Sequence, residues 1–397
     1  MSLQRLLLAA LFTPISKGRW GLPLCFWGEP GVAKSAMIEE IAATISLYCE
    51  VLSPGERGEG AFGCVPVPMN VEGRREHVDR DGERVHTFNP HTVLTYPAPE
   101  WAEKMGDGGL LFLDELTTAP PAIRPALLGL INDRRIGGST LNGRVRVGAA
   151  ANPPELVPDC YELPSTVMNR MGHLDWPAPT VEEHAAYMMR ASTGNGGKVE
   201  QKINALDEEA RVLAAWPEAW AWAVGVETAF LRARPQFKNL CPGSKAHREF
   251  IGGRKAAKQT VTGFEGVRGW PSDRSWELAT RALASSRVHQ LDDAEAELLV
   301  AGFVGEGVAC ELFAWMAAQD LPAPADLLDG KVAFVADHAR IDRTHAVFSG
   351  CATLLTAARC ERRVARKDAF YGIIEAYAKQ GVALDVAVTN LTAVMNA

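Results

Sequence analysis

A short stretch near the N-terminus contains residue types that bind phosphate groups. Gly28 to Gly31 forms a glycine-containing turn, and Lys34 and Ser35 follow it. The backbone N–H groups of such a turn and the N-terminus of a following helix attract an anion. We expect Lys34 to reach the β- and γ-phosphates of a bound nucleotide and the Ser35 hydroxyl to coordinate Mg²⁺. The residues expected to bind this cofactor here are Gly28, Gly31, Val32, Ala33, Lys34 and Ser35.

One position departs from the usual phosphate loop. The usual pattern has a glycine directly before the Lys-Ser pair, and Ala33 stands there in this chain. We expect alanine to be accommodated if its backbone stays in the right-handed region. A plain glycine-rich turn that happens to precede Lys-Ser is the alternative interpretation.

The residues on either side of the turn predict the elements that would position it. Leu22 to Trp27 is a short apolar run suited to a buried parallel strand. After Lys34, apolar residues recur at helical spacing up to Ile45. A strand, a glycine-rich turn and a helix in this order favour the phosphate-loop interpretation.

A second apolar segment ends in two carboxylates. Leu110 to Leu113 predicts a strand, and Asp114 and Glu115 follow it directly. We expect Asp114 to bind the metal and Glu115 to polarise the water that attacks the γ-phosphate. A strand that merely ends at a solvated acid pair is the alternative, and the preceding phosphate loop makes it less favoured.

A third predicted strand begins at Arg144 and ends at Asn152. An asparagine at the tip of a strand beside the other two can contact the γ-phosphate or the attacking water. Its alternative role is turn formation before Pro153, where asparagine is also favoured.

The three segments GEPGVAKS, LLFLDEL and GAAANPPE resemble the corresponding motifs of the AAA+ ATPases. The stretch from Asp114 to Ile136 is most similar to the MoxR branch, and Gly269 to Leu283 looks like the second-sensor helix of a lid. The resemblance implies an α/β fold, a P-loop AAA+ core with a parallel sheet flanked by helices. A helical lid domain and a helical C-terminal extension would follow.

The resemblance also implies roles for individual residues. Asn152 corresponds to the first sensor, and Asp114 and Glu115 to the metal-binding acid and the catalytic base. Arg170 stands where the family places an arginine finger that reaches a neighbouring subunit, and Arg274 matches the second-sensor arginine. Each arginine could instead be an ordinary surface or salt-bridged residue.

Arg134 and Arg135 are competing arginine-finger candidates near a subunit interface. We predict three parts of the chain from the resemblance and from the change of pattern around Pro177. They are residues 1–178, the AAA+ α/β nucleotide-binding domain; 179–319, the helical lid domain with a basic loop at about 232–270; and 320–397, the helical C-terminal extension.

Two β-hairpins are predicted around turn-forming residues. The first covers Asn70 to Phe88 with its turn at Asp79 to Glu83, and the second covers Arg134 to Val147. The resemblance implies that the first hairpin faces the pore of a ring. We expect these loops either to contact a substrate or partner or to be simple solvated turns, and the sequence leaves the two open.

Two further segments have an unusual composition. Trp216, Trp220 and Trp222 are so closely spaced that we expect them in a core or a subunit interface. Arg232 to Lys258 holds eight basic residues against one acid, Glu249. This basic segment predicts either a surface for an acidic partner or nucleic acid, or a solvated loop.

The overall composition excludes several classes of protein. The net charge of −7 argues against a general grip on nucleic acid. The eight cysteines form no CxxC pair, which indicates a reducing cytoplasm rather than a disulfide framework. The longest early apolar run, Leu6 to Phe12, is too short to cross a membrane, so we expect no membrane partner.

The resemblance implies a function and partners. It implies a homo-oligomer, a hexameric ring that hydrolyses ATP with Mg²⁺ and remodels or matures a client protein, one carrying a von Willebrand factor A domain. A chelatase-like role is a variant of the same activity. A nucleic-acid-stimulated motor or restriction/defence subunit and an ATP-gated scaffold with little turnover are the alternatives.

Overall fold

The computed structural model describes most of the chain. The described residues are 3–63, 65–78, 84–153, 156–157, 161–178, 180–182, 185, 188–189, 202–242, 244–249, 268–318, 321–334, 341–357, 360–379 and 385–396. Residues 250–267 of the predicted basic loop and the turn at 79–83 therefore lie outside the described residues.

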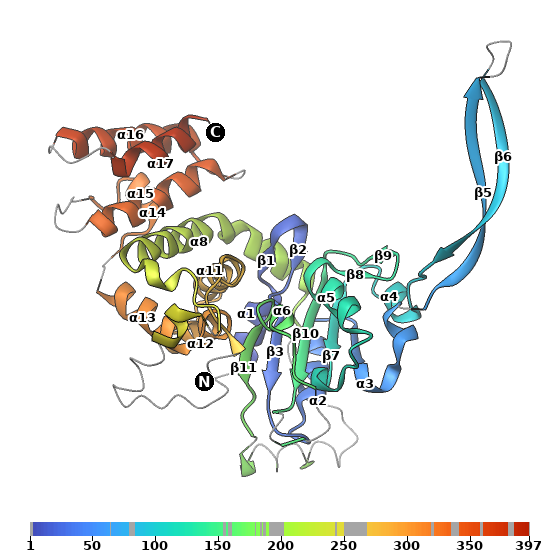
Figure 1. Cartoon of the computed structure of the whole chain (residues 1–397). Helices are drawn as coiled ribbons and strands as arrows, with labels where there is room; N and C mark the ends of the chain where they lie inside the picture. Colours follow the sequence, from blue (N-terminus) through green and yellow to red (C-terminus); the bar gives the residue numbers. More distant parts are fainter. Residues whose placement is uncertain are drawn as a thin grey trace.

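A parallel sheet forms the centre of the N-terminal part of the molecule (Figure 1). Its five strands are β3 (Leu24–Trp27), β4 (Cys49–Leu52), β7 (Gly109–Leu113), β10 (Val145–Ala151) and β11 (Gly172–Asp175). They lie in the order β11-β3-β10-β7-β4 and all pair in parallel. The chain leaves β3 toward β4 and later crosses from β10 to β11 in the opposite direction. The carboxyl end of β3 is therefore at the reversal point where open α/β sheets bind ligands.

Helices cover both faces of this sheet, because successive side chains of a strand point to opposite faces. Phe26 and Phe112 pack on the face covered by two N-terminal helices. Trp27 and Leu113, their sequence neighbours, pack on the other face. The helices are α1 (Leu3–Leu11) and α2 (Lys34–Thr44) on the first face, and α4 (Glu100–Lys104), α5 (Arg124–Asp133) and α6 (Ser165–Met168) on the second. The predicted fold class, an α/β core with a parallel sheet flanked by helices and followed by a helical part, is confirmed.

A helical region follows the sheet and packs against its β11 edge. Its helices are α8 (Ala205–Ala233), α11 (Asp273–Val288), α12 (Asp293–Val304) and α13 (Glu306–Ala317). Ser272 with Ser275 and Asp292 with Glu295 form capping boxes that fix where α11 and α12 begin. A Cβ added to Gly302 of α12 would lie 3.0 Å from the carbonyl oxygen of His173, so α12 approaches β11 closely.

The C-terminal helices have an apolar cluster of their own, which includes Phe348, Phe370 and Tyr377. They are α14 (Pro324–Leu328), α15 (Ile341–Thr356), α16 (Arg363–Lys379) and α17 (Asp385–Met395). Helix α15 packs along α8. A Cβ added to Gly225 of α8 would lie 2.6 Å from the carbonyl oxygen of Ala346, so glycine permits this close packing.

The three clustered tryptophans lie on α8 and pack against the main core. Trp216 and Trp220 stack with their ring centroids 6.1 Å apart. The Arg281 and Arg287 guanidinium groups, both from α11, lie over the rings of Trp220 and Trp222 at 4.8 Å. All three rings are partly buried against the core, which confirms the prediction of a packing role.

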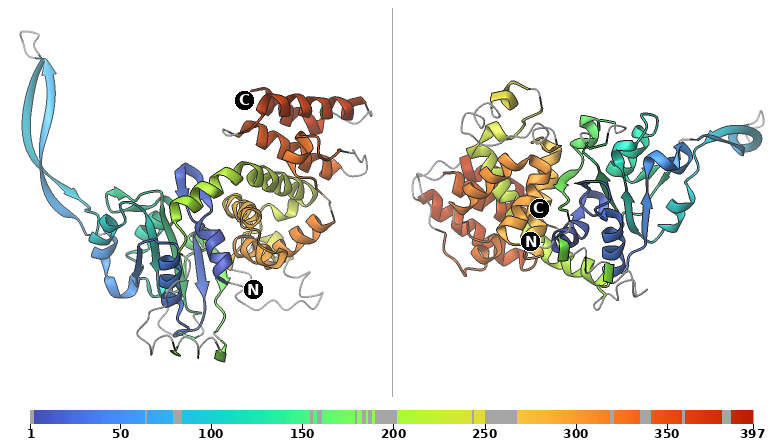
Figure 2. Two further views of the ribbon diagram at one scale, coloured as in Figure 1. Left: turned by 180° about the vertical axis from the view of Figure 1, so that it is seen from behind. Right: turned by 90° about the horizontal axis from the view of Figure 1, so that it is seen from below.

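Both predicted hairpins form. Strands β5 (Val67–Val78) and β6 (Arg84–Thr95) pair antiparallel over their full length. This ribbon extends away from the body, on the side opposite the C-terminal helices (Figures 1 and 2). The second hairpin is much shorter and consists of β8 (Arg135–Ile136) and β9 (Ser139–Thr140).

Candidate functional site

The phosphate-loop candidate connects β3 to α2 at the carboxyl edge of the sheet. Gly28 lies close to Trp176, because an added Cβ would lie 3.0 Å from Cβ of that residue. Gly31 has φ +82°, a conformation that residues with a Cβ rarely adopt. The loop therefore favours glycine at both positions, at Gly28 for the close approach of Trp176 and at Gly31 for the backbone conformation.

The expectation of a right-handed backbone at Ala33 is wrong. Ala33 has φ 59° and ψ 31°, which lies in the left-handed region. A residue with a Cβ pays about 1–2 kcal/mol for this conformation. The loop thus keeps the path that glycine follows without strain, and strained residues of this kind concentrate at functional sites.

Lys34 is almost fully buried in the loop that it follows, with 7% of its surface exposed. Its Nζ donates to the carbonyl oxygens of Gly28, at 3.0 Å, and Glu29, at 2.9 Å. It also donates to Oδ1 of Asn152 at 3.0 Å. The amine is therefore pointed into the cradle formed by the loop and held there by oxygen atoms.

Ser35 and the two predicted acids meet beside this lysine. The Ser35 hydroxyl donates to Oδ2 of Asp114, and Oδ1 of Asp114 accepts the backbone N–H of Glu115 at 2.9 Å. Burial lowers the pKa of Lys34, and the charges of Asp114 and Glu115 act in the opposite direction. A hydroxyl and a carboxylate are oxygen ligands of the kind that Mg²⁺ prefers, so this donor set fits an ATP·Mg²⁺ complex.

Glu115 differs from its neighbour because its side chain is exposed. Its backbone has φ 51°, again in the left-handed region. The carbonyl oxygen of Glu115 accepts the hydroxyl of Thr118 at 2.8 Å, which helps to hold this turn. A carboxylate that is solvent-accessible and held beside the metal-ligand candidates is suited to accept a proton from water.

Asn152 reaches the loop because β10 lies between β3 and β7 in the sheet. The backbone N–H of Gly28 donates to the carbonyl oxygen of Ala151 at 3.3 Å, and Asn152 follows directly. Only 5% of Asn152 is exposed. The structure thus brings its amide between the phosphate loop and the acid pair.

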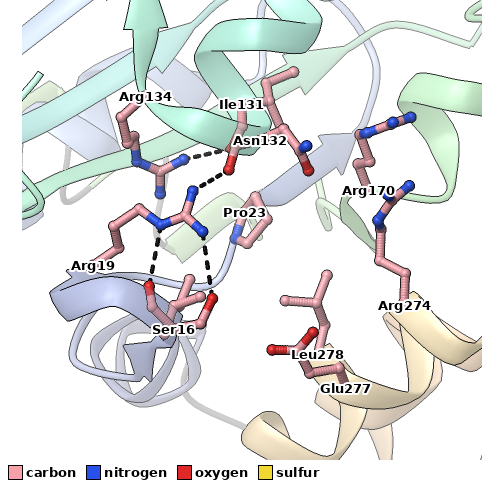
Figure 3. A pocket seen from close by; sticks show the side chains of 11 residues that line it. Ser16, Arg19, Pro23, Ile131, Asn132, Arg134, Arg170, Arg274, Glu277 and Leu278 are labelled. Atoms are coloured by element: carbon pink, nitrogen blue, oxygen red, sulfur yellow. Dashed lines mark hydrogen bonds between the residues drawn. The ribbon is translucent and has the colours of Figure 1, made fainter. Parts of the chain in front are cut away.

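Arg170 and Arg274 lie at the opposite edge of the sheet. Arg170 precedes β11, and Arg274 stands in the first turn of α11. Both line a cavity of about 90 Å³ that also includes Pro23, the residue before β3, and their guanidinium groups lie next to each other (Figure 3). Because the phosphate loop begins after β3, the length of that strand, roughly 15 Å, separates the arginines from it.

Neither of these arginines has a carboxylate partner within the described residues. The Arg170 guanidinium donates to the carbonyl oxygen of Thr166, and its Nε has no described partner. Burial lowers the pKa of Arg170, and the nearby charge of Arg274 adds to this effect. The charge of Asp133 acts on Arg170 in the opposite direction, and Glu277 also lines the cavity. Neither acid forms an ion pair with these two arginines among the described residues, so an anion placed in the cavity would be attracted to two cations without a paired carboxylate.

The structure corrects one of the competing arginine candidates. Arg134 is only 2% exposed, and its Nε donates to the carbonyl oxygen of Val145 at 2.8 Å. A further donor binds the carbonyl oxygen of Ile131. Arg134 therefore supports its own chain and cannot reach a neighbour, whereas Arg135 in β8 is exposed.

The sequence did not point to two other residues that line the cavity shared by Arg170 and Arg274, which we call the arginine cavity. Arg19 lies in β2 (Arg19–Trp20), and its Nε donates to the carbonyl oxygen of Ser16 at 3.2 Å. Glu277 of α11 pairs with Arg281 at 3.0 Å. The two-residue strands β1 (Pro14–Ile15) and β2 give no recognisable sequence signal for this position.

The sequence also gave little sign of the residues that support the phosphate loop. The backbone N–H of Trp176 donates to the carbonyl oxygen of Trp27 at 2.6 Å. Nδ1 of His173 accepts the indole N–H of Trp27 at 3.0 Å, and Nε2 lies 2.8 Å from the carbonyl oxygen of Met168. A neutral imidazole protonated at Nε2 satisfies both contacts. Burial lowers the pKa of His173 to about 4, so it stays neutral near pH 7.

Comparisons with known proteins are sparse at the sequence level. No protein-family model matches the chain, and no curated protein matches it. Among solved structures, the chain is similar to one from Cytophaga hutchinsonii described as a "putative ATPase". The two share 16% sequence identity and a TM-score of 0.46, over 76% of this chain and 80% of the other.

Across the described residues, no helix has both the length and the apolar composition required to span a bilayer.

Proposed function

We propose that this chain is an ATPase of the MoxR-type AAA+ class that acts as a hexameric ring and remodels a client protein. The observation that supports this best is the convergence of five side chains at the carboxyl edge of one parallel sheet. They are Lys34, Ser35, Asp114, Glu115 and Asn152. Their types match the needs of phosphoryl transfer, in which positioning and charge stabilisation provide most of the catalysis.

Each residue then has a role that its position allows. ATP supplies the phosphoanhydride bond, and Mg²⁺ offsets the charge on its oxygens. Lys34 would exchange the loop carbonyls for phosphate oxygens, and Ser35 and Asp114 would hold the metal. Glu115 accepts a proton from the attacking water, and Asn152 orients that water or the γ-phosphate.

The two arginines serve the nucleotide of a neighbouring copy in this proposal. Arg170 and Arg274 lie roughly 15 Å from the phosphate loop of their own chain, beyond the far end of β3. A head-to-tail contact that closes into a ring would bring them to the loop of the next copy. Their guanidinium groups would stabilise the charge that develops on the transferred phosphoryl group.

The client in this proposal is a protein, one with a von Willebrand factor A domain, as the sequence resemblance implies. The β5–β6 ribbon is the element best placed to contact it, because it extends beyond the body of the molecule (Figure 2). Near its base the ribbon exposes apolar side chains at Met69 and Leu94.

The first test is the ATPase rate per subunit over a wide range of protein concentration. We expect the rate to rise with concentration and then level off, because a neighbour completes each site. Tight ATP binding with no turnover at any concentration would contradict the proposal and indicate an ATP-gated scaffold. Stimulation by DNA or RNA that falls steeply with salt would favour the nucleic-acid motor instead.

A further inference from the structure

A larger cavity, of about 470 Å³, lies in the helical part of the molecule. It is separate from the phosphate loop and from the arginine cavity, and shares no lining residue with either. Its walls come from α8, α11, α15 and α16, so it lies where the helical region after the sheet meets the C-terminal helices. The volume is within the range of about 300–1,000 Å³ that is typical of small-molecule sites.

Small side chains on α8 leave this space open. Ala214, Ala215 and Ala219 line the wall, together with Pro217 inside the same helix. Leu354 of α15 provides a buried apolar surface. The cavity therefore offers a partly apolar lining against which the body of a ligand can pack.

Three arginines from three different helices also line the cavity. Arg211 of α8 is already bound to both carboxylate oxygens of Glu208, at 2.8 and 2.6 Å. Arg366 of α16 is likewise bound to both carboxylate oxygens of Asp329, each at 2.9 Å. These two guanidinium groups are held in place by acids of their own chain.

Arg287 of α11 is different. Its side chain forms no hydrogen bond or ion pair with a described residue, and its guanidinium lies 4.8 Å from the ring centroid of Trp222. Stacking on an aromatic face leaves the in-plane N–H donors of a guanidinium available. Partial burial of the guanidinium lowers the pKa of Arg287, while the negative charges of Asp326 and Glu218 act in the opposite direction. Arg287 is thus an exposed cation that stacks on Trp222 and has unused side-chain donors beside an open cavity.

Two carboxylates complete the polar lining. Glu218 lies 3.5 Å from Arg366, and Glu361 lines the cavity near α16. A simple anion would be repelled by these acids as well as attracted by Arg287. A molecule that presents an anionic group to Arg287 and N–H or O–H donors to the carboxylates would match both kinds of group.

We propose that this cavity binds a small molecule that carries a phosphate or carboxylate group together with hydrogen-bond donors. The anionic group contacts Arg287, and the rest of the molecule packs against the alanine-rich wall of α8. The site is independent of ATP hydrolysis and can be tested without measuring that activity.

Calorimetric titration of the full chain with inorganic phosphate and with citrate, at constant ionic strength and without Mg²⁺, tests the proposal. The titrations are repeated in Lys34→Ala, because the phosphate loop also attracts anions, and in Lys34→Ala combined with Arg170→Ala, because the cavity lined by Arg170 and Arg274 attracts them as well. We expect saturable binding to persist in Lys34→Ala and to weaken about 10-fold or more when Arg287→Gln is added. Lys379→Gln changes the net charge equally, lies outside the cavity and should leave the affinity unchanged.

A substitution that should increase the affinity for the anionic probes complements the Arg287 variants. Glu218→Gln removes a repelling carboxylate and should tighten binding of either probe by about 3-fold. Arg287→Lys keeps the charge but not the planar fork, and should lose part of the affinity even if Arg287→Gln folds poorly.

The relative affinity for phosphate and citrate identifies the anionic group of the ligand. Binding of either probe that depends on Arg287 supports the proposal. The absence of saturable binding in Lys34→Ala, or equal affinity with and without the Arg287 substitutions, would overturn it.

Discussion

At the carboxyl edge of the sheet Lys34 is held by two loop carbonyls and by Asn152, and Ser35 is held by Asp114. At the amino edge Arg170 and Arg274 share a cavity and have no described carboxylate partner. At the carboxyl edge the polar side chains bind one another, while at the amino edge two arginines lie side by side without a paired carboxylate among the described residues. This difference is what we expect if the amino edge of one copy completes the carboxyl edge of the next.

The largest expected effect comes from removing the loop lysine. Lys34→Ala should weaken ATP binding at least about 100-fold and abolish turnover, because the phosphates lose their principal cation. Calorimetric titration with ATP measures this. Lys104→Ala is a matched control, since Lys104 is an exposed lysine paired with Glu100. Equal ATP affinity in wild type and Lys34→Ala would show that the loop does not bind the phosphates.

Substitution of an arginine at the amino edge should lower the ATPase rate without changing the affinity for ATP. Arg170→Ala should lower the steady-state ATPase rate about 1,000-fold and leave ATP affinity unchanged, since arginine fingers contribute at this level. Mixing it with Lys34→Ala subunits should restore part of the rate, because one copy offers an intact loop and the other an intact arginine. Arg135→Ala, at the exposed competing candidate on β8, should leave the rate unchanged, and an equal loss there would assign the arginine finger to Arg135 instead. A loss of ATP affinity in Arg170→Ala would place Arg170 in the loop of its own chain and contradict the comparison.

Substitution of Glu115 at the carboxyl edge should slow ATP hydrolysis while leaving ATP binding intact. Glu115→Gln should bind ATP but hydrolyse it about 100-fold more slowly or worse, because the amide cannot accept the proton from water. Single-turnover kinetics with pre-bound ATP measure this step. Wild-type turnover in Glu115→Gln would mean that another group acts as the base.

His173 lies between the two edges and predicts a pH dependence of stability. Its pKa is lowered by burial from 6.5 to about 4, so the unfolded chain binds more protons between these values. The contribution of neutral His173 to the free energy of unfolding should therefore be fully present above pH 6.5. The free energy of unfolding should fall by up to about 3 kcal/mol as the pH drops to 4. Urea denaturation at several pH values measures this. His173→Gln should show a shallower slope, and an unchanged slope would assign the effect to other groups.

The smallest effect concerns the strained residue of the loop. Ala33→Gly should raise the free energy of unfolding by up to about 1 kcal/mol, because glycine adopts the left-handed backbone without a Cβ conflict. Ala36→Gly is the matched control in the exposed part of α2 and should lower it by about 1 kcal/mol. Thermal or urea unfolding of both variants checks the two signs. Destabilisation by both substitutions would mean that Ala33 is not strained in solution.

Local pattern in the sequence predicted which residues lie at the carboxyl edge, because Asp114 and Asn152 directly follow strands and Lys34 follows a strand and a turn. The apolar run ending at Trp27 became β3, and the run ending at Leu113 became β7. In a parallel sheet the residues that follow such strands emerge at one edge, so the local pattern placed Lys34, Asp114 and Asn152 at that edge, and the strand order then brought them together.

The amino edge and the supports of the loop were not predictable in the same way. Arg170 and Arg274 were singled out by resemblance, but their contact depends on how α11 packs against the sheet. The backbone of Ala33 was predicted wrongly because local sterics favour the right-handed region, whereas the path of the loop between β3 and α2 imposes the other one. Arg134 was misjudged because burial cannot be read from residue type.

The sequence by itself determined the α/β class, the glycine-rich turn before Lys34 and the acids after β7, since each depends on short-range pattern and residue chemistry. Only the tertiary structure decided the strand order β11-β3-β10-β7-β4, which places Asn152 between the loop and the acids. It also decided that Arg170 meets Arg274 and that Arg287 borders an open cavity. These arrangements depend on long-range packing of helices on the sheet and on one another, which local propensity does not encode.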